Sequence, residues 1–213
     1  YNCIYDCRYC FLQGMYSSAN YVLFVNYENF LEKINELIEE NKNEELTFFS
    51  GYDCDSIALE KITGFVSYIL PKIMFKTNSL FEFRTKSIQI EPFLKHEPSE
   101  NIIIAFSLLP EEVASKLDHR TPSIAKRMIS IKKLSLYGWK IGLRLDPLIY
   151  HKNWKKNYEK LFQQIFLNLN YKNIHSISFG SLRFPKEMFK KIYKMYPEEK
   201  LFSYDFKIRK NYV

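Results

Sequence analysis

The sequence predicts an α/β fold with mostly parallel strands in one domain. Short apolar segments alternate with longer amphipathic segments along the 213 residues, the pattern of repeated β–α units over a parallel sheet. The chain is 17% aromatic and 46% hydrophobic, so it can bury a substantial core and lies far from the composition of disordered proteins. No low-complexity tract or linker divides it, and we expect a single domain over residues 1–213.

The expected strands are short apolar segments that end near polar residues, as buried strands of a parallel sheet do. In chain order they are Leu46–Ser50, Phe81–Thr85, Ile102–Leu108, Lys140–Leu145 and His175–Phe179.

The expected helices lie between the strands and follow the repeat of an amphipathic helix. In the first of them Phe30, Ile34 and Leu37 share one face, with acids and amides opposite. Pro185 marks the start of the last one. In chain order the predicted helices are Tyr27–Asn41, Ser56–Leu70, Glu111–Leu117, Ser123–Tyr137, Asn157–Asn168 and Lys186–Tyr196.

Three of the four cysteines, Cys3, Cys7 and Cys10, form a C-x3-C-x2-C triplet near the amino terminus. Such a triplet can bind three irons of a cuboidal [4Fe–4S] cluster, which takes one thiolate per iron. The fourth iron then lacks a local protein ligand and can chelate the amino and carboxylate groups of S-adenosylmethionine. The triplet therefore predicts a metal site, and the neighbouring Tyr9 and Phe11 would shield it from water.

Zinc and disulfides are the competing interpretations of the triplet. Structural zinc takes four ligands, usually as two pairs. Cys54 or a histidine could complete such a site, but the sequence has no second C-x2-C or H-x3-H pair. Four cysteines in 213 residues are few for a disulfide framework. We prefer the cluster and keep zinc as the alternative.

The triplet, with an aromatic residue beside its last cysteine, resembles the signature of radical S-adenosylmethionine enzymes, and the rest of the chain is similar to the spore photoproduct lyase family. The most family-specific stretch is the run His151-x2-Trp154-x3-Tyr158-x2-Leu161-Phe162-Gln163. The other similar stretches are Cys10–Gln13, Phe24–Asn26, Arg84–Lys86, Phe106-Ser107, Gly138–Gly142, Arg183-Phe184 and Tyr196-Pro197.

The resemblance implies a partial (β/α)6 TIM-like radical S-adenosylmethionine barrel. We expect its first strand just before Cys3, missing from what we take to be an excerpt of a longer chain. Ligands of parallel β/α folds bind at the carboxyl ends of the strands, so the residues that leave those ends are the candidates for cofactor binding.

Four residues at predicted strand ends are candidate cofactor ligands. Lys86 can pair with the methionine carboxylate of S-adenosylmethionine, a role that the family resemblance supports. Ser107 corresponds to the family's cofactor-contacting serine, and Ser50 and Gly51 correspond to a turn around the cofactor's amino group. The alternatives are a solvent-exposed lysine, a serine in a turn and a glycine that permits positive φ.

Arg144 and Asp146 alternate on one predicted strand and therefore share a face. We prefer a buried ion pair between them over a role in binding.

This chain differs from the family at two positions whose residues the family uses in the last step of the reaction, the return of a hydrogen atom. The family has a hydrogen-donating cysteine just after the second strand, where this chain has Tyr52, with Cys54 two residues later. It also has a tyrosine directly after the third cluster cysteine, where this chain has Phe11. Two residues of extended chain span about 6.6 Å, so Cys54 can replace the donor only if the loop bends. Cys54 and Tyr52 are the candidate catalytic residues that return the hydrogen.

The net charge of +7 is concentrated in the last third of the chain. Residues 151–213 carry 14 Lys and Arg against 5 Asp and Glu, whereas residues 1–150 carry 17 against 19. Basic and aromatic residues alternate at 154–158 and 206–212. This pattern fits two interpretations equally well. The residues could bind the phosphate backbone of a nucleic acid and stack on its bases, or they could form an ordinary solvent-exposed surface. We expect nucleic acid as a possible partner of this region.

No apolar run approaches the roughly 20 residues of a membrane helix, so we expect no membrane partner. Reduced thiols and an oxygen-sensitive cluster predict a cytoplasmic protein. The cluster would also need an electron donor such as flavodoxin or ferredoxin.

The leading hypothesis is a carbon–carbon lyase of the radical S-adenosylmethionine type. It would cleave the cofactor to a 5′-deoxyadenosyl radical that abstracts hydrogen from a thymine-dimer lesion in DNA, and a damaged dinucleotide leaves the stack at lower cost than an intact one. One alternative keeps the radical chemistry with a different, non-lesion substrate. A second is a non-catalytic, metal-containing module that binds nucleic acid.

Overall fold

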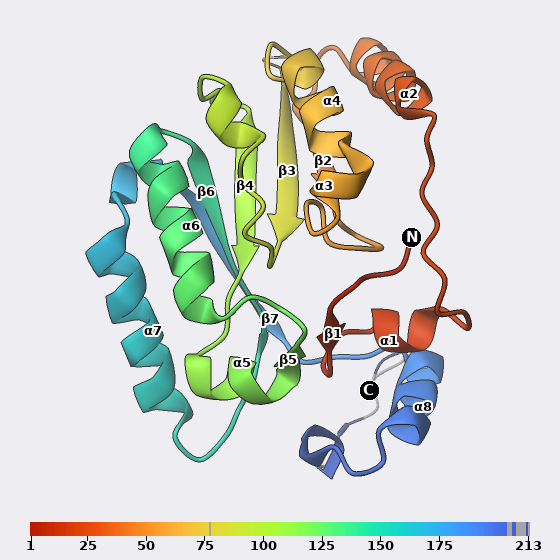
Figure 1. Ribbon diagram of the computed structural model, residues 1–213, viewed down its shortest axis with the longest axis vertical. Helices are drawn as coiled ribbons and strands as arrows, with labels where there is room; N and C mark the ends of the chain where they lie inside the picture. The colour runs from red at the N-terminus through yellow and green to blue at the C-terminus, as the bar shows by residue number, and fades with distance from the viewer. Residues whose placement is uncertain (77, 204–205, 208–211, 213) are drawn as a thin grey trace.

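The computed structural model describes residues 1–76, 78–203, 206–207 and 212. Five parallel strands form its main sheet, in the order β2-β3-β4-β6-β7. They are β2 (Leu46–Ser50), β3 (Ser79–Thr85), β4 (Ile102–Ser107), β6 (Lys140–Leu148) and β7 (Ile174–Ser181). All five predicted strands and their parallel pairing are confirmed, and the sheet curls into a half barrel (Figure 1). The sixth strand, which we expected just before Cys3, is not among the strands of the described residues. The basic segment predicted at 206–212 lies mostly outside the described residues.

Helices connect the strands and pack mainly on one face of the sheet (Figure 1). They are α1 (Leu12–Met15), α2 (Tyr27–Glu40), α3 (Glu60–Thr63), α4 (Phe65–Ile73), α5 (Glu111–Leu117), α6 (Ile124–Tyr137), α7 (Trp154–Asn168) and α8 (Lys186–Met195). Three short 3-10 helices are η1 (Phe93–Lys95), η2 (Tyr171–Asn173) and η3 (Lys200–Ser203). Among the described residues, we find no helix with the length and apolar composition of a membrane span.

The single helix predicted over Ser56–Leu70 is wrong, because two helices occupy this region. Gly64 adopts a left-handed conformation, with φ of 58°, and so ends α3 and begins α4. The Glu60 carboxylate accepts hydrogen bonds from the backbone N–H groups of Val66 and Ser67, both at 2.9 Å. These bonds satisfy two free N–H groups at the start of α4 and stabilise the break.

The helix-facing side of the sheet forms the apolar core. Phe81 and Phe83 of β3 pack there with alternate residues of β4 and β6, such as Ile104 and Leu143, and all four are at most 4% exposed. Trp139, which is fully buried before β6, donates its indole N–H to the carbonyl of Phe93 at 3.0 Å. This burial on one face leaves the opposite, inner face for polar side chains.

The inner face carries a buried ion pair, but not the one that we predicted. Arg144 of β6 pairs with Glu82 of β3, with Nη2 2.5 Å from Oε2 and Nε 3.0 Å from Oε1. Arg84 donates to the same carboxylate at 2.8 Å. Asp146 lies 3.7 Å from Arg183 instead. The Arg144–Asp146 pair is therefore wrong, because Arg144 reaches across the inner face of β4, where Ala105 is small.

Replacing Glu82 with glutamine is expected to destabilise the protein by about 2 kcal/mol at neutral pH, since two arginines lose a charged acceptor. Burial acts to raise the pKa of Glu82, but Arg144 and Arg84 outweigh it and hold the pKa below its usual 4.5. The stabilisation is therefore present above pH 4.5 and lost as pH falls through the lowered folded-state pKa. Urea unfolding at pH 7 and at pH 3 checks both parts.

The control is Glu36→Gln on the surface of α2, where the carboxylate of Glu36 pairs with Lys33 at 2.8 Å and both side chains are more than half exposed. This change should cost less than about 1 kcal/mol. Equal losses at the two positions would contradict the assigned role of Glu82.

Candidate functional site

The cysteine triplet lies at the carboxyl ends of the strands. Two residues of its loop form the short strand β1 (Asp6–Cys7), which pairs antiparallel with β5 (Asp118–His119) after α5. Figure 1 shows β1 and α1 beyond the tip of the β3 arrow, where ligands of parallel β/α folds bind. This two-stranded ladder was not predicted, because two residues carry no periodic signal.

The three cysteines are free thiols in a protected environment. Cys7 is 3% exposed, and Cys3 and Cys10 are partly buried. Burial raises the pKa of Cys3 to about 12, and it raises the pKa of Cys7 and of Cys10 as well. Such thiols are poor nucleophiles at neutral pH, so metal coordination, which deprotonates a thiol outright, suits them better than thiolate catalysis.

Lys86 lies directly after β3 and close to the triplet. Its ammonium is 5.4 Å from the centre of the Tyr9 ring. Burial acts to lower the pKa of Lys86, but negative charge on Cys7, Asp118 and Cys10 outweighs it and raises the pKa. Lys86 therefore lies close to the cysteine loop, and its charge opposes the charge that three thiolates would carry.

A carboxylate that the sequence analysis missed, Asp55, anchors the segment after β2 to the end of β3. It accepts hydrogen bonds from the backbone N–H groups of Ile57 at 3.1 Å and Ala58 at 3.0 Å. It also accepts from the Thr85 hydroxyl and from the backbone N–H of Lys86, both at 2.6 Å. Asp55 thus fixes the backbone from which Lys86 projects. Asp55 directly precedes the predicted helix Ser56–Leu70, and an aspartate at that position is typical of a helix N-cap.

The other predicted cofactor residues lie on the same edge of the sheet. Ser50 is the partly buried last residue of β2. Gly51 has φ of +86°, and a Cβ there would lie 2.5 Å from Ser56 Oγ and 2.8 Å from the Arg84 carbonyl oxygen. Only glycine fits both the conformation and the space. Ser107 ends β4, which is separated from β2 by β3 alone, and it lies beside Arg144 of β6.

The two positions that depart from the family are neighbours in space. The rings of Phe11 and Tyr52 have centroids 6.0 Å apart, so Tyr52 lies beside the residue that follows Cys10. Its side chain is 74% exposed. Cys54 is partly buried, and the charges that act on it come from the amino terminus, Asp55 and Asp53. Of the two candidate hydrogen donors, Tyr52 lies beside Phe11, the residue directly after Cys10.

The donor set fits a cluster better than a single ion. Among the residues that the structure describes, no three His, Cys, Asp or Glu side chains converge closely enough to bind one metal ion. A cuboidal cluster instead takes thiolates on separate irons. Three free thiols on one loop, with the cation of Lys86 close to Tyr9 of that loop, meet that requirement.

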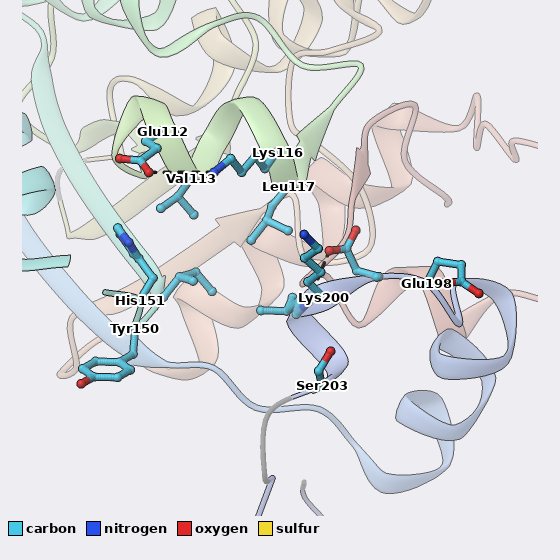
Figure 2. A pocket seen from close by; sticks show the side chains of 12 residues that line it. Glu112, Val113, Lys116, Leu117, Tyr150, His151, Glu198, Lys200 and Ser203 are labelled. Atoms are coloured by element: carbon cyan, nitrogen blue, oxygen red, sulfur yellow. Dashed lines mark hydrogen bonds and ion pairs between the residues drawn. The ribbon is translucent and has the colours of Figure 1, made fainter. Parts of the chain in front are cut away.

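A cavity of about 750 Å³ lies beside this site, between α5, the segment after β6 and η3 (Figure 2). Its apolar wall includes Val113, Leu117, Ile149 and Leu201. The Nε2 atom of His151, at the start of the family-specific run, is buried without a hydrogen-bond partner among the described residues. The cysteines and Lys86 do not line this cavity.

Comparison with known proteins agrees with this arrangement. The family model described as spore photoproduct lyase matches residues 1–212. The chain belongs to this family. The spore photoproduct lyase of Clostridium acetobutylicum is 29% identical over 200 residues, which are 93% of this chain and 59% of that protein. The enzyme of Bacillus subtilis is 24% identical over 202 residues, with the same coverage. The chain thus spans about three fifths of the length of these spore photoproduct lyases.

Solved structures of spore photoproduct lyases have the same fold. A mutant with bound AdoMet and dinucleoside spore photoproduct superposes with a TM-score of 0.84 at 23% identity, covering 97% of this chain and 61% of that one. A complex with dinucleoside spore photoproduct gives the same TM-score and identity, covering 93% of this chain and 59% of that one. At this identity the likeness confirms the partial barrel that we predicted.

Proposed function

We propose that the protein is a radical S-adenosylmethionine enzyme that repairs spore photoproduct in DNA. The observation that carries the proposal is the set of three buried or partly buried free thiols at the carboxyl ends of the strands, with the ammonium of Lys86 5.4 Å from the ring of Tyr9 in the same loop. Membership of the spore photoproduct lyase family supports this choice of substrate. Two of the matching structures hold that dinucleoside.

In this proposal Cys3, Cys7 and Cys10 hold a [4Fe–4S] cluster, and the residues at the strand ends hold S-adenosylmethionine. Bound there, the two cofactors would supply a 5′-deoxyadenosyl radical that abstracts a hydrogen atom from the lesion. Lys86 would pair with the methionine carboxylate of the cofactor. Ser107 and the turn of Ser50 and Gly51 would contact the rest of it.

The direct test is product formation by the anaerobically reconstituted protein. With reductant, S-adenosylmethionine and dinucleoside spore photoproduct, we expect 5′-deoxyadenosine together with the repaired dithymidine. Cofactor cleavage without repair would favour a family member with a different substrate. Metal retention with salt-dependent binding of nucleic acid and no 5′-deoxyadenosine would favour the non-catalytic module.

Tyr52 is the hydrogen donor that we favour for the final step, since its ring contacts Phe11 beside Cys10. Tyr52→Phe is expected to lower the yield of repaired dithymidine several-fold while cofactor cleavage continues, because the phenolic hydrogen is lost. Cys54→Ala serves as the matched variant from the same loop and should leave the yield unchanged. Chromatography of both products in one reaction separates repair from cofactor cleavage. The reverse result would move the role to Cys54.

Two partners complete the proposal. The phosphate backbone of a DNA strand would bind to the basic last third of the chain. Adjacent lysines occur there in α7 and α8, and Lys155 and Lys191 are examples. A small electron carrier such as flavodoxin or ferredoxin would reduce the cluster.

A further inference from the structure

Asp118 and Arg127 form an ion pair that is closed to solvent. Their side chains are each 1% exposed, and Arg127 Nη2 lies 2.7 Å from Asp118 Oδ2. Removing two charges from water is costly, and apolar side chains of similar volume often stabilise a core at least as well. Stability alone is therefore a weak explanation for this pair. The hydrogen bonds around it indicate a second role.

The guanidinium of Arg127 joins three segments at the carboxyl end of the sheet. Besides the bond to Asp118, Nη1 donates to the Ser107 carbonyl oxygen at 3.0 Å, at the end of β4. Nε donates to the Pro122 carbonyl oxygen at 2.9 Å, and Nη2 also donates to the Thr121 hydroxyl at 2.6 Å. Because the guanidinium is planar, these bonds fix β5 relative to the strand end that carries Ser107.

Asp118 connects Arg127 to the cysteine loop. Its second oxygen, Oδ1, accepts a hydrogen bond from the Tyr9 hydroxyl. Its backbone pairs with Cys7 in the β1–β5 ladder, and the neighbouring N–H of Arg8 donates to the Leu117 carbonyl oxygen at 2.9 Å. The loop is thus attached to Asp118 through a side chain and through the backbone.

We propose that Asp118 and Arg127 are positioning residues that hold the cysteine loop at a set distance from the end of β4. The inference rests on the proposed function, in which thiols on the loop and residues at the strand ends bind one cofactor assembly. Those two halves come from segments about a hundred residues apart in the chain. The buried connection from Tyr9 through Asp118 and Arg127 to Ser107 sets their separation before any cofactor binds, as supporting residues around metal ligands do.

The first test uses the metal-free protein. In the double variant Asp118→Leu with Arg127→Met, which removes one charge of each sign, amide hydrogens of residues 6–9 should exchange about tenfold faster than in the wild type, while those of β3 and β4 keep their rates. Tyr9→Phe removes a single hydroxyl from the same network and should give a smaller increase at the same residues. It keeps the test decisive if the double variant does not fold.

The second test uses the protein reconstituted with its cluster. Both variants should bind S-adenosylmethionine more weakly, by about tenfold in the double variant. The change in the electron paramagnetic resonance spectrum of the reduced cluster on adding the cofactor should differ from that of the wild type. A residue that merely stabilised the fold would alter neither.

Asn101→Ala is the matched control at the opposite end of β4. Asn101 is 5% exposed and donates to the carbonyl oxygens of Ile73 at 3.1 Å and Lys76 at 3.0 Å. Its loss should lower the free energy of unfolding. Amide hydrogen exchange at residues 6–9 and the affinity for the cofactor should stay unchanged. If the double variant and Tyr9→Phe behave like this control, the inference is overturned. A wild type that binds neither cluster nor cofactor would instead overturn the proposed function, and the exchange experiment would still decide the positioning role.

Discussion

Replacing Cys7 with alanine is expected to reduce bound iron and cofactor cleavage to background. A cluster held by three thiolates loses one of its protein anchors. Cys7 is the most deeply buried of the three cysteines and pairs with Asp118 in the β1–β5 ladder. Iron analysis after anaerobic reconstitution and chromatography for 5′-deoxyadenosine measure the two losses.

The chain contains a natural control for this experiment in Cys54. It is also a partly buried free thiol with a raised pKa, but it lies after β2 and outside the triplet. Cys54→Ala should retain the iron and the cofactor cleavage of the wild type. Equal iron losses in the two variants would show that Cys54 binds the metal together with the triplet, as in the zinc interpretation.

The main sheet was predictable because its signal is local. Each strand is a short apolar segment, and the core face alternates along it, as with Phe81 and Phe83. The helix break at Gly64 had a signal too, an isolated glycine inside a helical pattern, but its effect depends on the carboxylate of Glu60 reaching the next helix. Boundaries of this kind depend on contacts that form after the elements do.

The candidate site was predictable only in part, because much of it is built from pairs that are distant in sequence. The triplet and Lys86 could be named from spacing, strand ends and family resemblance. Asp118 could not, since its partner Tyr9 is 109 residues away and its strand has two residues. The partner of Arg144 was mispredicted for the same reason, because Glu82 lies 62 residues away on a strand beyond β4.

Replacing Asp55 with alanine is expected to destabilise the protein by about 3 kcal/mol or more and to weaken binding of S-adenosylmethionine. The loss would leave four donors without their acceptor, among them the backbone N–H of Lys86. A buried donor left unpaired costs about 1–3 kcal/mol. Urea unfolding measures the first effect and isothermal titration of the reconstituted protein measures the second.

Asp55→Asn separates the two effects because the carboxylate divides its bonds unequally. Oδ1 accepts from Ile57, Ala58 and Thr85, whereas Oδ2 accepts from the backbone N–H of Lys86 alone. An asparagine that keeps its oxygen toward the three donors turns its NH2 group toward Lys86, so two donors face each other. We therefore expect a smaller loss of stability than in the alanine variant, about 2 kcal/mol, together with a comparable loss of cofactor affinity. Normal affinity in this variant would show that the position of Lys86 does not depend on Asp55.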